Sequence, residues 1–356
     1  MYRMDIKSSL KDYSLFIVDE FSATLENEYE EGDFLIIDKN IIALYGNKLL
    51  NQKWGNNVIE IEANENQKSY LGLEPVIQQL IEKGFRKNNR LFAIGGGITQ
   101  DVTAFISSII YRGVDWLFFP TTLLAQGDSC IGSKTSINFG KYKNQLGNFY
   151  SPRKIFVDLN FLDTLSARDL TSGLGEMLHY FLVAGEEDFI RFKREYSAAR
   201  VDKEVLKNLL IRSLEIKKSY IEIDEFDKKE RQVFNYGHSF GHAIESLSNY
   251  EIPHGVAVSI GMDMSNYVSV KYGYQSAESR FAAKELLQQV WKGFTIKNLN
   301  QNHFENALRK DKKNKGNLLG LILSKGPGKT FKEFKPLDEI FSSWLTAYFR
   351  DEFTES

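Results

Sequence analysis

The sequence predicts an α/β domain with a mostly parallel sheet, followed by a mainly α-helical domain. Three observations support this fold class. The chain has 356 residues, more than the roughly 250–300 at which a single hydrophobic core stops growing. Short apolar runs alternate with helical patterns in the first half, as in βαβ units. From about Leu162 strand-like runs become rare, so we expect one domain over residues 1–160 and a second over residues 161–356.

The strands of the first domain are expected where short apolar runs end at polar turns. These runs are Phe34–Asp38, Val58–Ile61, Leu91–Ile94, Trp116–Pro120 and Ile155–Asp158. Between them, apolar residues at helical spacing predict helices at Leu73–Lys83 and Val102–Ile110. Buried strands that alternate with helices favour a parallel sheet.

Long helical patterns dominate the second domain. They cover Ala167–Val183, Lys203–Glu222 and Gln232–Ser248. The lysine-rich stretch Arg309–Lys315 has two interpretations, a solvated loop or a loop that binds phosphates or acidic partners.

The charge balance and the cysteine count exclude several classes of protein. Lys+Arg number 45 and Asp+Glu 47, so no bulk charge attracts nucleic acid or an anionic membrane. The single cysteine, Cys130, cannot form an internal disulfide or a multi-cysteine zinc site, which indicates a reducing compartment. The N-terminus lacks the residue order of a signal peptide, and no apolar run approaches the roughly 20 residues that span a bilayer. We therefore expect a soluble cytoplasmic protein.

A glycine run directly follows the third predicted strand and opens a helical segment. Gly95, Gly96 and Gly97 would let the backbone approach a pyrophosphate, which the helix N-terminus attracts. A tight structural turn explains the run equally well, because it is not the G-x-G-x-x-G fingerprint. Asp38 ends the first predicted strand, where a carboxylate can accept hydrogen bonds from a ribose.

Four of the five histidines fall in two short clusters. His238 and His242 lie four residues apart, on one face of a helix, and His254 follows. His179 lies three residues after Glu176, again on one helix face. Imidazole and carboxylate together suit Zn²⁺ with three protein ligands and an open position. The alternative is a set of core or capping histidines. The HExxH metalloprotease motif is absent, because a serine replaces its glutamate.

Basic side chains gather near glycines in both halves of the chain. Each alone is a surface charge, but together they favour a site for a phosphorylated, acidic small molecule. They are Arg112, Lys134, Lys143, Lys217 and Arg231.

Five stretches together resemble 3-dehydroquinate synthase and the wider sugar-phosphate cyclases. They keep their order and spacing over roughly 160 residues from Gly95 to His254, and are GGGITQD, the run from Tyr111 to Leu165, GLGEMLHY, FNYGHSFGHAIE and PHGVAVSIG. The resemblance implies a Rossmann-like NAD-binding domain joined to a helical metal-binding domain, and usually a homodimer.

The resemblance also implies a role for individual residues. Its metal ligands fall on Glu176, His238 and His254, with Zn²⁺ or Co²⁺ as the ion, and His242 contacts substrate. Other substrate positions fall on Asp128, Lys134, Asn144, Lys217, Arg231 and Asn235, while Arg112 reaches a substrate phosphate across the dimer. Lys312 or Lys313 matches a late lysine of the phosphate pocket. NAD contacts are expected from Asp38, Glu65, Lys68, Gly96, Gly97, Asp101, Thr121, Thr122 and Lys143.

The implied activity is NAD- and metal-dependent cyclisation of 3-deoxy-arabino-heptulosonate 7-phosphate to 3-dehydroquinate and phosphate. This is a carbon–oxygen lyase step of the shikimate pathway, which leads to the aromatic amino acids. Alternative substrates are sedoheptulose 7-phosphate, glucose 6-phosphate or an amino-heptulosonate. A metal-dependent polyol dehydrogenase and a binding protein without turnover are further alternatives.

Three positions depart from the family pattern. His179 stands where members that make 3-dehydroquinate usually have lysine, Gln100 where glycine is common, and Ser133 where a glycine precedes Lys134. His179 favours another substrate, and the other two would narrow the cofactor or substrate space. The presence of Lys217, Arg231 and Asn235, which hold a carboxylate in the family, favours an acidic heptulosonate.

Overall fold

The computed structural model describes residues 2–50, 52–140, 142–296 and 300–353. The chain divides into two compact units, the first comprising Met1–Ser166 with Lys217–Phe226 and the second Ala167–Ile216 with Asp227–Ser356. Helix α7 (Lys203–Ile223) contributes residues to both. The domain boundary expected after residue 160 stays a prediction.

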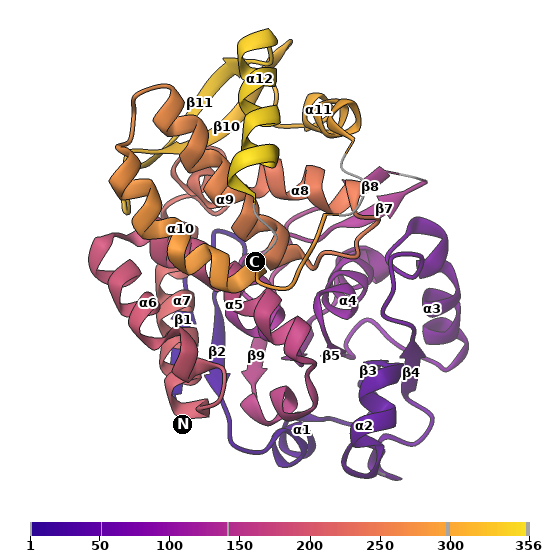
Figure 1. Ribbon diagram of the computed structural model, residues 1–356. Helices are drawn as coiled ribbons and strands as arrows, with labels where there is room; N and C mark the ends of the chain where they lie inside the picture. Colours follow the sequence, from indigo (N-terminus) through magenta and orange to yellow (C-terminus); the bar gives the residue numbers. More distant parts are fainter. Residues whose placement is uncertain (1, 51, 141, 297–299, 354–356) are drawn as a thin grey trace. The chain divides into compact units, whose positions relative to one another are not determined.

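The first unit contains a seven-stranded sheet (Figure 1). In sheet order its strands are β1 (Tyr2–Ile6), β2 (Tyr13–Ile17), β9 (Lys154–Val157), β6 (Trp116–Pro120), β5 (Leu91–Gly95), β3 (Phe34–Asp38) and β4 (Val58–Ile61). Only the pair β1–β2 is antiparallel among these strands. Every residue of β3, β5 and β6 is buried, which explains their continuous apolar runs. The predicted α/β domain with a mostly parallel sheet is confirmed.

Helices and short turns connect these strands. They are α1 (Phe21–Glu28), α2 (Lys39–Leu49), η1 (Gln52–Trp54), α3 (Tyr70–Glu82), α4 (Gly97–Ile109), η2 (Ile110–Arg112), the π-helical η3 (Ala125–Ser129) and η4 (Leu159–Thr164). The chain passes from β3 outward to β4 and then returns to β5 on the other side of β3. The carboxyl ends of β3 and β5 are therefore a topological switch point, where open α/β sheets bind ligands.

The second unit is mainly helical, as predicted, and is built around one buried helix. Its helices are α5 (Ala167–Ala184), α6 (Glu186–Ala199), η5 (Glu230–Asn235), α8 (His238–Leu247), α9 (His254–Lys271), α10 (Ala277–Trp291), α11 (Gln301–Arg309), α12 (Glu339–Ala347) and η6 (Tyr348–Glu352). Helix α9 is buried at every residue from Gly255 to Ser269. No helix among the described residues is both long and apolar enough to cross a membrane.

The single helix predicted over Gln232–Ser248 is wrong. A 3₁₀ turn, η5, ends at Asn235, and Gly237 adopts a left-handed φ of 79° before α8 begins at His238. A residue with a Cβ is strained at this φ, so the glycine both stops the first turn and starts the helix. The antiparallel hairpin of β10 (Leu318–Ser324) and β11 (Thr330–Pro336) was not predicted.

Glycines let the helices of the second unit approach closely. A Cβ on Gly175 of α5 would overlap the backbone of Gly255 in α9, and a Cβ on Gly255 would overlap the carbonyl of Ser172. On the other side of α9, a Cβ on Gly241 of α8 would press against the backbone of Val258. The glycines beside the clustered histidines therefore bring the three helices that carry them together.

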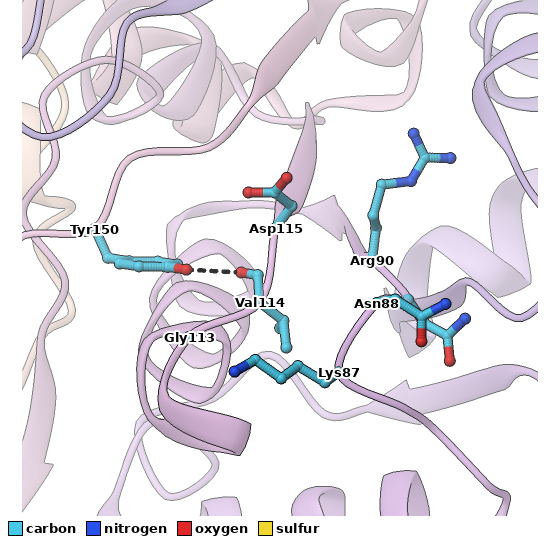
Figure 2. Close-up of a pocket in the computed structure, with 8 residues that line it drawn as sticks. Lys87, Asn88, Arg90, Gly113, Val114, Asp115 and Tyr150 are labelled. Atoms are coloured by element: carbon cyan, nitrogen blue, oxygen red, sulfur yellow. Dashed lines mark hydrogen bonds between the residues drawn. The ribbon is translucent and has the colours of Figure 1, made fainter.

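A pocket of about 290 Å³ lies at the amino-terminal ends of β5 and β6 (Figure 2). Lys87, Arg90, Asp115 and Tyr150 line it, and the Tyr150 hydroxyl donates a hydrogen bond to the Val114 carbonyl at 3.0 Å. None of the site residues expected from the sequence lines this pocket. The pocket lies at the opposite ends of the strands from the topological switch point.

The buried cysteine gives a first prediction. Burial raises the pKa of the Cys130 thiol from 9.0 to about 12. The thiolate fraction at pH 8 then falls from about one in ten to about one in ten thousand. We expect thiol reagents to modify the native protein at less than about a hundredth of the rate for the unfolded chain. Above pH 9.0 the thiol ionises in the unfolded chain but stays protonated in the native protein. The free energy of unfolding should therefore be unaffected by this thiol below pH 9.0 and should fall between pH 9.0 and about 12. Equal rates for native and unfolded protein would contradict the burial of Cys130.

Candidate functional site

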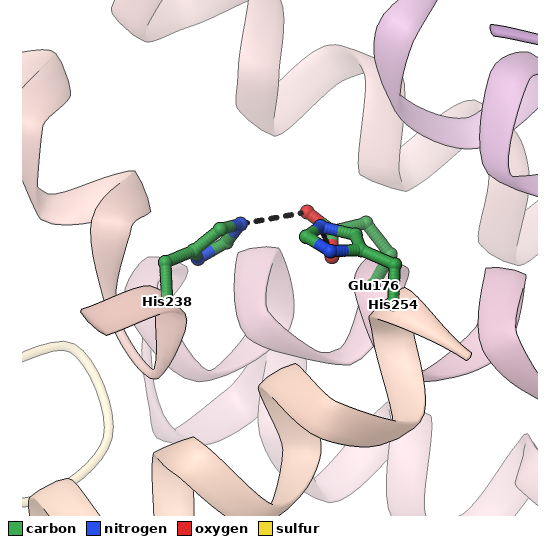
Figure 3. Close-up of side chains that lie close together, drawn as sticks. All are labelled: Glu176, His238 and His254. Carbon is green, nitrogen blue, oxygen red and sulfur yellow. Dashed lines mark ion pairs between the residues drawn. The ribbon is translucent and has the colours of Figure 1, made fainter. Parts of the chain in front are cut away.

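A carboxylate and two imidazoles converge in the second unit (Figure 3). Glu176 comes from the middle of α5, His238 is the first residue of α8, and His254 is the first residue of α9. Their ligand atoms all lie within 4.8 Å of one another. Nε2 of His238 lies 3.4 Å from Oε1 of Glu176, and Nε2 of His254 lies 3.5 Å from Oε2.

The second nitrogen of each ring has its own partner. Nδ1 of His238 lies 3.2 Å from the Tyr236 carbonyl oxygen, and Nδ1 of His254 lies 3.0 Å from Oε2 of Glu245. Both partners are acceptors, so each Nδ1 can donate a hydrogen bond to its partner. With a cation held between the rings and Glu176, each neutral ring would then present the lone pair of Nε2 to the cation. This is the arrangement that histidine ligands adopt at metal sites.

The burial of Glu176 tests whether a cation fits here. Its side chain is 3% exposed, and no group among the described residues donates a hydrogen bond to its Oε2. Burial alone would raise the pKa of Glu176, but the neighbouring histidines, His238 above all, outweigh it and lower the pKa. A buried carboxylate anion with two imidazole Nε2 atoms fits Zn²⁺ or a similar divalent ion.

His242 lies next to this trio on α8. Its ring centroid is 5.5 Å from that of His238 and 5.7 Å from that of His254. Lys313 is among the positive neighbours that lower the pKa of His242, after the larger effect of desolvation. Lys313 pairs with Asp311 at 2.9 Å, whereas Lys312 is exposed. Of the two late lysines, Lys313 therefore lies at the candidate site.

His179 is buried beside the trio, with 1% of its side chain exposed. Its Nδ1 donates to the Glu176 carbonyl at 2.6 Å, within the same helix. The ring packs against Tyr180 at 3.9 Å and edge-on to Phe234 and His238. The ring thus packs beside Glu176 and His238. That His179 belongs to the catalytic residues stays a prediction.

Two more predicted residues of the second unit lie on η5. Arg231 is buried, and Asn235 donates from Nδ2 to the Gln232 carbonyl at 3.1 Å. The turn is held against α5, the helix that carries Glu176. The polar groups of η5 thus have a fixed position relative to Glu176.

In the first unit, the glycine run lies at the switch point of the sheet. Gly96 precedes α4 as its N-cap, and Gly97 begins the helix. A Cβ on Gly97 would have only the Ser129 hydroxyl within 4 Å, whereas one on Gly96 would press against Thr122. Thr121 donates its backbone N–H to Gly95 at 3.0 Å, which joins the ends of β5 and β6. The free amides at the start of α4 can receive a pyrophosphate.

Four of the predicted NAD residues form one charged network beside α4. Lys68 pairs with Asp101 at 2.6 Å, and Lys143 pairs with Glu65 at 2.8 Å. Asn138 connects to Glu65, donating from Nδ2 at 2.7 Å. Burial raises the pKa of Asp101 despite Lys68, whereas Lys143 and Asn138 overcome burial and lower the pKa of Glu65.

The β7–β8 hairpin (Ile137–Phe139, Tyr142–Leu146) brings Asn144 to the same network. Asn144 has a left-handed φ of 53°, and its backbone N–H donates to Oδ1 of Asn138 at 3.0 Å. Ser136 donates from its hydroxyl to Oδ1 of Asn144 at 3.0 Å and from its N–H to Asp101 at 3.1 Å. Asp38 ends β3 and accepts from the Asn40 N–H at 2.9 Å as the cap of α2, and burial raises its pKa.

Asp128 and Lys217 form an ion pair in the first unit, as part of the expected substrate set. Nζ of Lys217 lies 2.8 Å from Oδ1 of Asp128 and 2.6 Å from its carbonyl oxygen. The side chain of Lys217 is 7% exposed. Lys134 and Arg112 are exposed, and Arg112 has a left-handed φ of 64°.

Gln100 and Ser133, the two residues expected to narrow the cofactor or substrate space, make hydrogen bonds that hold one loop. Gln100 donates from Nε2 to the Ser129 carbonyl at 2.6 Å, and the Ser129 hydroxyl donates back to its Oε1 at 2.6 Å. Ser133 donates to Glu225 at 3.0 Å. The loop that directly follows Asp128 is therefore held by polar contacts at Ser129 and at Ser133.

This contact gives a second prediction. Gln100→Leu leaves the partly buried Ser129 carbonyl without its donor, so we expect the free energy of unfolding to fall by about 1–3 kcal/mol. Thermal unfolding followed by circular dichroism measures the loss as a lower midpoint. The control Gln79→Leu changes an exposed residue and should stay within about 0.5 kcal/mol of wild type. Equal midpoints of thermal unfolding for Gln100→Leu and Gln79→Leu would contradict a stabilising contact between Gln100 and Ser129.

Sequence reasoning missed four polar partners in these networks: Ser129, Asn138, Glu225 and Glu245. Only Glu245 had a signal, because it lies seven residues after His238, two helical turns along one face. The other three are contacts between segments distant in sequence, which periodicity cannot reveal.

Two protein families match consecutive parts of this chain. Residues 58–172 match the family described as 3-dehydroquinate synthase N-terminal, and residues 173–314 match that described as 3-dehydroquinate synthase C-terminal. The 3-dehydroquinate synthase of Campylobacter concisus (strain 13826) is 36% identical over 268 residues, which are 75% of this chain and 76% of that protein. The one of Alkaliphilus metalliredigens (strain QYMF) is 32% identical over 356 residues, or 98% and 99% of the two chains.

A solved structure shares the fold over nearly the whole chain. It is 2-deoxy-scyllo-inosose synthase complexed with carbaglucose-6-phosphate, NAD⁺ and Co²⁺, with a TM-score of 0.86 and 22% sequence identity. The superposition covers 98% of this chain and 100% of that one. With two consecutive family matches and relatives above 30% identity over most of their length, the chain belongs to the 3-dehydroquinate synthase family.

Proposed function

We propose that this chain catalyses the NAD- and divalent-metal-dependent cyclisation of 3-deoxy-arabino-heptulosonate 7-phosphate to 3-dehydroquinate with release of phosphate. The convergence of Glu176, His238 and His254 in a member of this family carries the proposal. The relatives at 32–36% identity are 3-dehydroquinate synthases, which supports the same reaction here.

The predicted residues fall into a proposed metal site and a proposed cofactor site. Glu176, His238 and His254 would hold Zn²⁺ or Co²⁺, and the amides at Gly96 and Gly97 with the Lys68–Asp101 network would hold NAD. When bound, the ion supplies a Lewis acid that acidifies a substrate hydroxyl, and NAD accepts a hydride and returns it. The buried ring of His179, which packs beside the proposed ligands, would help to exclude water from the metal site.

The remaining residues would position an acidic, phosphorylated substrate. The Asp128 carboxylate and carbonyl hold the Lys217 ammonium in one place, so that its charge is directed without side-chain rearrangement. Arg231 offers a planar pair of donors suited to a carboxylate. Lys134, Asn144, Asn235, His242 and Lys313 would contribute further hydrogen bonds and charge, in keeping with the family resemblance.

His179 favours a second candidate within the same reaction class. Its buried ring cannot extend a flexible cation as a lysine does at this position. Sedoheptulose 7-phosphate and glucose 6-phosphate have no carboxylate, so a cyclase for either has less need of such a cation; an amino-heptulosonate is a further alternative substrate. The same site with a different substrate would then explain the substitution.

A substrate panel tests the proposal. The metal-loaded protein is incubated with NAD⁺ and each candidate sugar phosphate in turn, and released phosphate is measured. We expect release from the heptulosonate phosphate alone. Release only from another sugar phosphate would select the second candidate, and stoichiometric NADH from an unphosphorylated polyol would point to a dehydrogenase.

We also propose that the protein acts as a homodimer, in which Arg112 serves the substrate of the partner copy. The 13 residues of α4 place Arg112 roughly 20 Å from the Gly97 turn of its own chain. Light scattering should give about twice the chain mass of 40.9 kDa.

Complementation between inactive variants tests this role of Arg112. Arg112→Ala and Glu176→Gln should each be inactive, and mixed subunits should regain about a quarter of wild-type activity by statistical exchange. Failure of exchanged subunits to regain any activity would contradict a role of Arg112 across the dimer.

A further inference from the structure

We propose that Glu245 is a positioning residue, which fixes the His254 ring so that Nε2 faces Glu176. The inference rests on the proposed metal site and assigns a role to a residue outside the ligand set. Glu245 lies on α8, two helical turns beyond His238 and on the same face of the helix.

The contacts of His254 define both of its nitrogens. Nδ1 lies 3.0 Å from Oε2 of Glu245, and Nε2 lies 3.5 Å from Oε2 of Glu176. Each nitrogen therefore faces a different carboxylate. The side chain of Glu245 is only 14% exposed, so its hydrogen bond to the ring is shielded from competing water.

A carboxylate can only accept a hydrogen bond, so the shared proton lies on Nδ1. When a cation lies beside Glu176, it takes the place of a proton on Nε2, and the ring that keeps its proton on Nδ1 presents the Nε2 lone pair to that cation. The negative charge of Glu245 also makes the ring a stronger donor to a cation. His238 shows the same device with a neutral partner, because its Nδ1 faces the Tyr236 carbonyl.

One other arrangement has to be distinguished. His242, Glu245 and His254 also have ligand atoms within 4.8 Å of one another. A cation held by that group would make Glu245 a ligand instead of a positioning residue. The burial of Glu176 and the distance from its Oε1 to Nε2 of His238 favour the first arrangement.

The test measures metal affinity directly, by competition of the full-length protein with a chelator for Zn²⁺ or Co²⁺. Loss of such a hydrogen-bond partner typically lowers metal affinity by about 10–100-fold, and Glu245→Ala should approach the upper limit. Glu245→Gln should lower the affinity by about tenfold, because its amide oxygen still accepts the hydrogen bond from Nδ1. The visible spectrum of the Co²⁺ form should keep its intensity but shift, since the ligands remain while one ring tilts. Glu187→Ala, which removes an exposed carboxylate of the same unit, is the matched control and should bind like wild type.

Each further outcome is decisive. Wild-type affinity in both Glu245 variants would overturn the positioning role while leaving the proposed function intact. Loss of the metal in His242→Ala and Glu245→Ala, with retention in Glu176→Gln, would make Glu245 a ligand and overturn both. If Glu245→Ala does not fold, as judged by circular dichroism, Glu245→Gln decides alone, and an unchanged dissociation constant overturns the inference.

Discussion

Glu176→Gln is expected to remove the bound metal and to lower kcat/KM by at least about a thousandfold. The substitution keeps the size of the side chain but removes the buried negative charge that faces both Nε2 atoms. Lewis-acid catalysis contributes several kcal/mol, and each 1.36 kcal/mol is a factor of about ten in rate. Metal content per chain after gel filtration, together with phosphate release, measures both effects.

The matched control for this prediction is Glu187→Gln, which changes an exposed glutamate of the same unit. It should retain one metal ion per chain and wild-type activity. If Glu176→Gln also retains one metal ion per chain, the ligand set assigned here is wrong.

Lys217→Met should reduce both stability and activity. It leaves the carboxylate of Asp128 without the ammonium at 2.8 Å, and breaking a partly buried pair costs about 2–4 kcal/mol. Loss of a charged substrate contact adds about a 10–100-fold decrease in kcat/KM. Thermal unfolding and steady-state kinetics measure the two losses separately.

A double variant separates the two roles of this pair. In Lys217→Met/Asp128→Asn no charge is left unpaired, so most of the lost stability should return while activity stays low. Recovery of activity together with stability would show that the pair is only structural.

The sequence predicted the strands β3, β4, β5, β6 and β9 to within one residue at each end because buried parallel strands are continuous apolar runs. Strands that pair in antiparallel hairpins were not predicted. β11 is TFKEFKP, whose half-exposed charged residues resemble a loop, and β8 is YKNQL. Such strands are set by pairing with a partner, which composition does not show.

The candidate site was predictable to the extent that its residues share one motif or one helix face. His238, His242 and Glu245 lie on α8, and the glycines that press α5 and α8 against α9 lie in the same motifs. The hydrogen bond between Gln100 and Ser129 joins residues 29 positions apart in the sequence, so it depends on tertiary packing. The sequence therefore indicated which histidine and glutamate side chains lie together, but not the contacts that hold the surrounding segments in place.

The most direct test of the proposed chemistry counts the phosphate released per NAD⁺. Purified metal-loaded protein is given a small, known amount of NAD⁺ and a large excess of heptulosonate 7-phosphate. Because the proposed reaction returns its hydride, many phosphates should be released for each NAD⁺, and NADH absorbance should not accumulate. Release that stops at one phosphate per NAD⁺, with an equal amount of NADH, would contradict the account.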